Sequence, residues 1–226
     1  MLTYKPIISK DSTYYDIKAL YRSSFPTLEQ LPWFLLSYRA LTGYAQMIAF
    51  FNNKQAPSNR DGDELNDTKL NDAKLDDHKF DKTEFDDTIS DFIGFAYLIP
   101  YKDIICIMFM AVPEHHQGKG YGSEFLKKVR ELYPHHRLCL YMEELNPAAE
   151  NYDERIIRSR FYERNGYVPM HYTVHESNVV YDMLASGGDV KEPEYNELMK
   201  RFLGPYLYAI YHKPWDRIFT ALKFIP

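Results

Sequence analysis

The chain has 226 residues and a formal net charge of −5, with 27 Lys or Arg against 32 Asp or Glu. No basic stripe indicates a nucleic-acid partner, and no apolar run approaches the roughly 20 residues of a membrane span. The start has no apolar signal region, and both cysteines, Cys106 and Cys139, lie in apolar runs. We therefore expect free thiols and a soluble, cytoplasmic protein, with a disulfide as the weaker alternative.

The first part of the chain predicts a strand over 2–8 and two helices. The first helix is expected to begin at Asp11 or Ser12, both of which are good helix caps. Thr27 is expected to cap the second helix, with Gln30 three residues later completing a capping box. The second helix is so rich in aromatic residues that it forms either core or one wall of a ligand channel.

Two aromatic and aliphatic runs, 44–51 and 92–99, predict a hairpin whose connection is unusual. Segment 52–90 holds eleven Asp or Glu against six Lys or Arg, so it carries the whole charge imbalance. Within it, 65–89 repeats every five residues, a period that gives neither a helix nor a strand one apolar face. Five repeats are too few to stack as a β-helix. We interpret 52–90 as a disordered, low-complexity insert at a hairpin tip.

The centre of the chain predicts a strand, a glycine-rich turn and a helix. Apolar run 104–112 ends before Pro113, and glycines follow at alternate positions 118, 120 and 122. The residues from 123 to 133 then have apolar side chains at helical spacing. Glycines leave backbone N–H groups unobstructed, and a helix start adds unpaired N–H groups with partial positive charge. Such a turn suits an anion, most often a phosphate or pyrophosphate.

The spacing of the loop separates it from two common phosphate-binding motifs and resembles a third. Lys119 precedes Gly120, which excludes a Walker P-loop, and the GxGxG spacing is one residue short of the dinucleotide motif. Gln117-x-x-Gly120-x-Gly122 instead resembles the acetyl-coenzyme A loop of the GNAT N-acetyltransferase superfamily. The stretch 161–167, FYERNGY, is similar to a second motif of that family. A structural glycine turn is the alternative.

The resemblance implies an α/β, GNAT-type acyl-CoA N-acyltransferase fold, a mixed, mostly antiparallel sheet with helices on both faces. We expect a GNAT domain over 1–187, interrupted by the insert, and a helical, aromatic extension over 188–226. The extension would pack on the domain or on a homodimer partner. The remaining predicted elements are strands over 137–144, 168–174 and 179–184 and helices over 155–165 and 194–203.

The resemblance also implies acetyl-CoA as donor and a set of residues that hold it. Ala111 and Val112 would pair with the pantetheine arm, and the Val112 N–H would polarise the acetyl carbonyl. Lys119 either contacts phosphate or is solvated. The pyrophosphate would lie on the loop, which consists of Gln117, Gly118, Lys119, Gly120, Tyr121, Gly122 and Ser123.

For catalysis, Tyr162 matches the tyrosine that often protonates the coenzyme A thiolate in this family, a role that a phenol protonated at neutral pH can fill. Glu143 is the expected general base, with solvated charge as the alternative and Asp182 as a further candidate. Arg155 stands where relatives often have an asparagine that contacts the coenzyme. His171 and His175 lie about 13 Å apart on a strand, so no metal site is expected.

The sequence therefore predicts an N-acetyltransferase that moves an acetyl group directly to a primary amine. The acceptor is open between a small amine, an antibiotic, a peptide N-terminus and a lysine. A catalytically inactive CoA-binding or sensor module and a transferase using another acyl-CoA are the alternatives. Neither nucleic acid nor membrane is expected as a partner.

Overall fold

The computed structural model describes residues 2–27, 29–53, 90–176 and 179–211. The five-residue repeat over 65–89 and the chain beyond Tyr211 lie outside the described residues. Residues 52, 53 and 90, which we expected in the insert, belong to strands, so the strands reach further toward the insert than the apolar pattern predicts. None of the helices in the described part of the chain has the length and apolar character of a membrane span.

Seven strands form one sheet in the order β1-β2-β3-β4-β5-β7-β6. Neighbouring strands are antiparallel throughout except for β4 and β5, which are parallel. The predicted hairpin is confirmed as β2 and β3, and the sheet is mixed and mostly antiparallel as expected. The strands are β1 (Leu2–Pro6), β2 (Gln46–Asn53), β3 (Ser90–Tyr101), β4 (Ile104–Ala111), β5 (Arg137–Glu143), β6 (Val168–Glu176) and β7 (Val179–Ser186).

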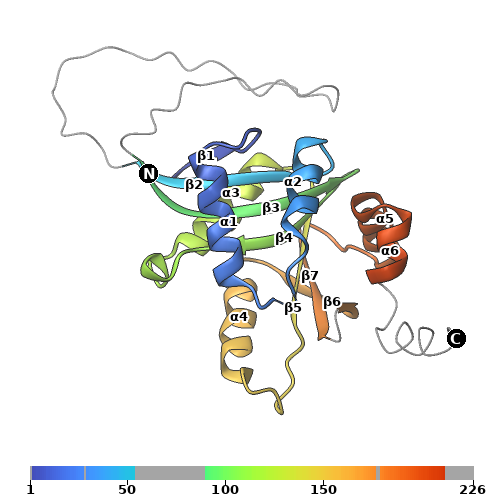
Figure 1. The fold of residues 1–226 in the computed structure, drawn as a ribbon. Coiled ribbons are helices and arrows are strands. Elements are labelled where there is room, and N and C mark those ends of the chain that lie inside the picture. The colour runs from blue at the N-terminus through green and yellow to red at the C-terminus, as the bar shows by residue number, and fades with distance from the viewer. Residues whose placement is uncertain (1, 28, 54–89, 177–178, 212–226) are drawn as a thin grey trace, which may run out of the picture.

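Helices cover both faces of the sheet, and each face has its own core. On one face α1 and α2, in front of the sheet in Figure 1, share a core with α5. On the other face α3 lies behind the sheet and packs Phe125, Leu126 and Val129 against it. The helices are α1 (Ser12–Ser24), α2 (Trp33–Leu41), α3 (Tyr121–Leu132), α4 (Tyr152–Arg164), α5 (Glu192–Leu203) and α6 (Pro205–Tyr211).

The two predicted helix starts differ in outcome. Asp11 caps α1 as expected, because its carboxylate accepts a hydrogen bond from a backbone N–H of the first turn at 3.0 Å. The capping box of Thr27 and Gln30 is wrong, since α2 begins at Trp33, after a proline. The amide of Gln30 instead donates to carbonyl oxygens at the end of α1, those of Arg22 and Phe25.

Strands β4 and β5 separate partway along their length. Their register pairs end at Cys106 and Cys139, although β4 continues to Ala111 and β5 to Glu143. A β-bulge lies in the same part of β4, just after the last paired residue. In the pairing of β3 with β4, Met108 is skipped between successive partners, and a bulge bends the strand that carries it. Beyond Cys106 and Cys139 the two strands are no longer paired, and we call the region between their unpaired ends the wedge.

Arg137, the first residue of β5, closes the other end of this strand pair. Its guanidinium lies 2.7 Å from the carboxylate of Asp103 and 2.9 Å from that of Glu194 on α5. It also donates to the backbone carbonyl of Asp189 at 2.6 Å. Helix α5 buries Tyr195 and other apolar residues in the same core as α1 and α2. The helix of the C-terminal extension is therefore held against the sheet of its own chain.

Candidate active site

The glycine loop lies between the end of β4 and the start of α3, after a short 3-10 helix at Glu114–His116. Gly118 and Gly120 have φ of 74° and 85°, in the left-handed region that glycine adopts without a Cβ penalty. A Cβ at either position would have no other atom within 4 Å. Both glycines therefore serve the backbone path of the loop, and the space beside them is open.

Five consecutive backbone N–H groups, those of residues 118–122, have no hydrogen-bond acceptor among the described residues. The two ends of the predicted loop differ from its middle. The N–H of Gln117 donates to Glu114, and that of Ser123 donates to Gly120, each at 3.0 Å. The unpaired groups lie at the positive end of the α3 dipole. The loop therefore has five N–H groups without a protein acceptor in the described structure, which is the arrangement that an anion-binding helix start requires.

Two side chains of the loop stabilise its shape. The amide of Gln117 donates to the carbonyl oxygen of Val112 at 3.1 Å, which ties the loop to the residue that follows β4. The ammonium of Lys119 donates to the carbonyl oxygen of His115 at 2.9 Å. Ala111 is buried and Val112 is partly buried at the end of the bent strand. The predicted donor-binding residues thus form one continuous segment beside the wedge.

Helix α4 brings Tyr162 to the same region. A Cβ at Gly122 would lie 3.1 Å from the ring of Phe161, so α3 and α4 pack closely at this point. Burial raises the pKa of Tyr162, which keeps its hydroxyl protonated at neutral pH, and the Arg158 guanidinium opposes this shift. In the described residues this hydroxyl has no hydrogen-bond partner. Tyr162 and Val112 pack against the same core, so the predicted proton donor and the predicted carbonyl-binding residue share one side of the sheet.

Glu143, the predicted base, lies at the end of β5 with its carboxylate already occupied. One oxygen is 3.0 Å from Arg155, the other is 2.7 Å from Arg158, and the Asn151 amide donates to both. Glu143 is only 8% exposed. Its contacts hold the start of α4 against the end of β5. They also explain Arg155, which bonds Glu143, the Asn151 side chain and a backbone carbonyl. The geometry favours a structural carboxylate over a proton acceptor.

A second glutamate, which the sequence analysis missed, lies beside this network. Glu29 is on the turn between α1 and α2, and burial together with the charge of Glu143 raises its pKa. The two arginines and a hydrogen bond with the Tyr181 hydroxyl oppose that shift. Nothing in the sequence marks this residue, because its neighbours come from β5, β7 and α4. Asp182 also has a raised pKa, caused by burial and by the charge of Glu144.

The histidines do not form a metal site in this part of the structure. Among the described residues there is no group of three or more His, Cys, Asp or Glu side chains placed to bind one ion. The rings of His115 and His116 are in contact at a tilt of 47°, with their centroids 4.2 Å apart. His175 lies beside Thr173 on β6, with 3.4 Å between its Nε2 and the Thr173 hydroxyl.

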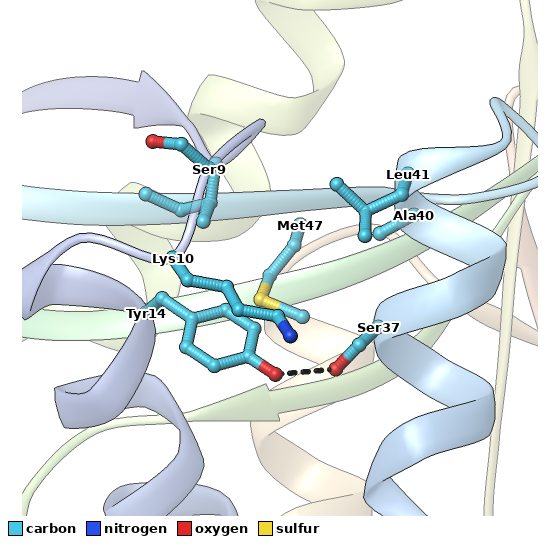
Figure 2. A pocket seen from close by; sticks show the side chains of 8 residues that line it. Ser9, Lys10, Tyr14, Ser37, Ala40, Leu41 and Met47 are labelled. Atoms are coloured by element: carbon cyan, nitrogen blue, oxygen red, sulfur yellow. Dashed lines mark hydrogen bonds between the residues drawn. The ribbon is translucent and has the colours of Figure 1, made fainter.

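A separate hollow lies between α1 and α2, on the sheet face opposite α3 (Figure 2). It is small, with a cavity volume of about 10 Å³, and Ala40 and Leu41 of α2 line it. The hydroxyls of Tyr14 and Ser37 lie 2.8 Å apart and satisfy each other. Among its lining residues only Lys10 carries a charge. The hollow has no acid–base pair, so we do not assign the chemistry to it.

Comparisons with known proteins agree with this geometry. Residues 83–169 match the family model described as an acetyltransferase (GNAT) domain, a segment that includes the glycine loop and Tyr162. No curated protein sequence matches the chain. A similar solved structure, named as a GNAT-family acetyltransferase from Bacteroides thetaiotaomicron, has a TM-score of 0.61 and 17% identity. That alignment covers 91% of this chain and 98% of the other.

Two further structures are similar in fold, each with a TM-score of 0.50 and 11% identity. One is the spermidine N-acetyltransferase of Vibrio cholerae in complex with CoA and spermine, aligned over 81% of this chain and 94% of that chain. The other is an aminoglycoside 6′-N-acetyltransferase complexed with coenzyme A, aligned over 81% and 96%. Likeness at this identity shows the fold alone. The matched segment shows a GNAT acetyltransferase domain over residues 83–169, and the fold of the chain is that of GNAT acetyltransferases.

Proposed function

We propose that this protein transfers an acetyl group from acetyl-CoA directly to a primary amine in a ternary complex. The observation that supports this most strongly is the row of five unpaired N–H groups at residues 118–122, next to the wedge between β4 and β5. An anion-binding helix start beside a strand edge suits a ligand that has both a pyrophosphate and an amide-containing arm. Coenzyme A combines these two features.

The site residues then have distinct tasks. The loop holds the pyrophosphate, Ala111 and Val112 pair with the amide-containing arm, and the Val112 N–H stabilises negative charge on the acetyl oxygen. One such donor contributes roughly 3 kcal/mol to transition-state stabilisation. Tyr162 protonates the departing thiolate, since its raised pKa keeps the proton available and its hydroxyl is not engaged elsewhere in the described structure. Acetyl-CoA itself supplies the activated thioester.

The acceptor is a primary amine, and the similar folds suggest which amines to try first. Their names include a spermidine and an aminoglycoside acetyltransferase, so a polyamine and an aminoglycoside are the first probes, followed by a peptide with a free N-terminus. Both cysteines are buried free thiols, as expected of a reducing compartment, and we propose the cytoplasm.

A thermal-shift experiment with acetyl-CoA, CoA, ATP and NAD in parallel tests the donor. A ligand at about 100 times its dissociation constant adds about 2.7 kcal/mol of stability. For a domain of this size that corresponds to a rise in melting temperature of roughly 5–10 °C. We expect the rise with acetyl-CoA and CoA only. A rise with ATP or NAD instead would contradict the proposal. If the protein binds CoA but releases no thiol from acetyl-CoA with any amine tested, it is a CoA-binding module rather than a transferase.

A further inference from the structure

Helix α2 is apolar on its outer side as well as on the side that faces the sheet. It buries Leu35 and Leu36 in the core that it shares with α1 and α5. Phe34, Tyr38 and Leu41 are nevertheless 76, 58 and 57% exposed. These three residues are spaced i, i+4 and i+7, so they lie on one face of the helix, and we call them the outer stripe of α2. A helix that is apolar all round is normally buried, so the outer stripe indicates a surface that another segment covers.

The single charged residue of α2, Arg39, ties the helix to the C-terminal part of the chain. Its guanidinium donates to the carbonyl oxygen of Leu203, the last residue of α5, at 3.0 Å. It also lies 4.8 Å from the centre of the Tyr44 ring, and the guanidinium of Arg201 on α5 lies 5.2 Å from the same ring. A Cβ at Gly204, between α5 and α6, would be 3.3 Å from the Arg39 guanidinium. The start of α6 is therefore held next to the last turn of α2.

The sequence that follows α6 has an apolar pattern like that of the outer stripe. Segment 212–226 lies outside the described residues, so only its sequence enters the argument. Trp215, Phe219 and Leu222 are spaced i, i+4 and i+7, which is typical of one apolar helix face. The acidic and basic residues of the segment fall outside that row. The segment therefore offers three apolar side chains with the same spacing as the three of α2.

Segment 212–226 is long enough to reach the outer stripe and is tethered close to it. Its 15 residues span up to roughly 50 Å when extended. The outer stripe is only about 10 Å long, since Phe34 and Leu41 are seven residues apart on a helix. A short tether gives an effective concentration on the order of millimolar. A segment of the same chain therefore has an advantage over a second copy of the protein, which must associate from dilute solution.

We propose that segment 212–226 packs Trp215, Phe219 and Leu222 against the outer stripe of α2 in the same chain. The contact removes the stripe from water. It also closes over one wall of the small hollow between α1 and α2, because Leu41 belongs both to the stripe and to the lining of the hollow. Helices α1 and α2 cover the face of the sheet opposite α3 (Figure 1), so the docked segment leaves the glycine loop free. This inference does not depend on the proposed acetyl transfer.

The two tryptophans of the chain provide the probe, because one of them is Trp215. Trp33→Phe keeps an aromatic ring on α2 and leaves Trp215 as the only tryptophan. Quenching of its fluorescence by acrylamide is measured in this variant and in the free peptide 212–226. We expect quenching in the protein to be several-fold slower than in the peptide. Quenching at the same rate in both would show that Trp215 is not covered, and the proposal would be overturned.

Substitutions in the outer stripe then test where the segment binds. In the Trp33→Phe background, Phe34→Ser with Tyr38→Ser should raise the quenching rate to that of the peptide. Ile157→Ser is the matched control, since it removes a 65% exposed apolar side chain from α4, and it should leave the rate unchanged. Circular dichroism shows that each variant is folded. If the stripe variant protects Trp215 as well as the control does, the segment binds elsewhere and the proposal is wrong.

Two measurements on protein with both tryptophans intact complete the test. Limited digestion with trypsin, followed by mass spectrometry, gives the rate of cleavage after Arg217. We expect this rate to be several-fold lower in the wild type than in Phe34→Ser with Tyr38→Ser, and equal rates would count against the docking. Light scattering gives the oligomeric state of the same two proteins. A wild-type dimer that the stripe substitutions dissociate would mean that a second copy covers the stripe, which overturns docking within one chain.

Discussion

Gly94 in β3 is the position where a single methyl group should disturb the fold most. Its φ is 141°, a region that side chains rarely adopt, and a Cβ there would overlap the Ala111 carbonyl oxygen and lie 2.7 Å from the Phe125 ring. Backbone strain costs about 1–3 kcal/mol and overpacking costs a further 1–3 kcal/mol or so. We therefore expect Gly94→Ala to lose about 4 kcal/mol, which lowers the melting temperature by roughly 8–16 °C.

Gly166→Ala is the matched control for the Gly94 experiment. Gly166 also has a positive φ, 78°, but the nearest atom to an added Cβ is the Ser186 hydroxyl oxygen at 3.9 Å, an ordinary contact. Only a left-handed backbone penalty of about 1–2 kcal/mol remains, or roughly 2–8 °C. Differential scanning calorimetry of both variants measures the difference. If the two proteins melt together, steric contact at Gly94 does not hold the end of β4 in place, and the reasoning is refuted.

The other predictions concern the site, the insert and the ion pairs. Tyr162→Phe should keep the acetyl-CoA thermal shift but lower kcat by roughly 10²–10⁴-fold; equal turnover at every pH would remove it as proton donor. Gly122→Asp should abolish acetyl-CoA binding in calorimetric titration, because the new side chain meets α4 and repels phosphate. Deleting 65–89 should leave the melting temperature nearly unchanged, since the β2–β3 register pairs lie outside that segment. Arg137 lowers the pKa of both carboxylates that it binds, so its stabilisation is present above their unfolded values and disappears as the pH falls through the folded ones. The melting difference between wild type and Arg137→Gln should accordingly narrow from pH 7 to pH 3.

The sequence predicts local elements of this protein well because their signals are local. The alternating glycines mark the loop and the start of α3, and apolar runs mark the central strands. Helix α4 begins at Tyr152, earlier than its predicted start at 155, and the acidic residues of its first turn are a signal that could have placed it. The Thr27 capping box fails because a proline before Trp33 starts α2 instead.

The environment of the site could not be predicted in the same way. The bulge at Met108 leaves no trace in an unbroken apolar run, and neither does the point where the pairing of β4 with β5 ends. From the sequence, Glu143 is only a carboxylate at the end of a strand. The folded structure shows that each of its two oxygens is ion-paired, one with Arg155 and the other with Arg158. Glu29 lies far along the chain from Glu143, and no periodicity in the sequence indicates that the charge of Glu143 raises the pKa of Glu29. Such features depend on which elements become neighbours in space, so only tertiary structure reveals them.

The pairing of β4 with β5 also has a consequence for how this protein unfolds. Strands β1–β4 form one antiparallel set and β5–β7 form another. The two sets meet at three parallel register pairs, and Arg137 at the start of β5 forms an ion pair with Asp103 just before β4. Parallel pairing is slightly weaker per residue than antiparallel pairing. Separation at this seam breaks no antiparallel ladder, but it opens both cores, because each core contains residues of both sets. The proposed donor site lies next to that seam, and a donor bound there would contact both sets of strands.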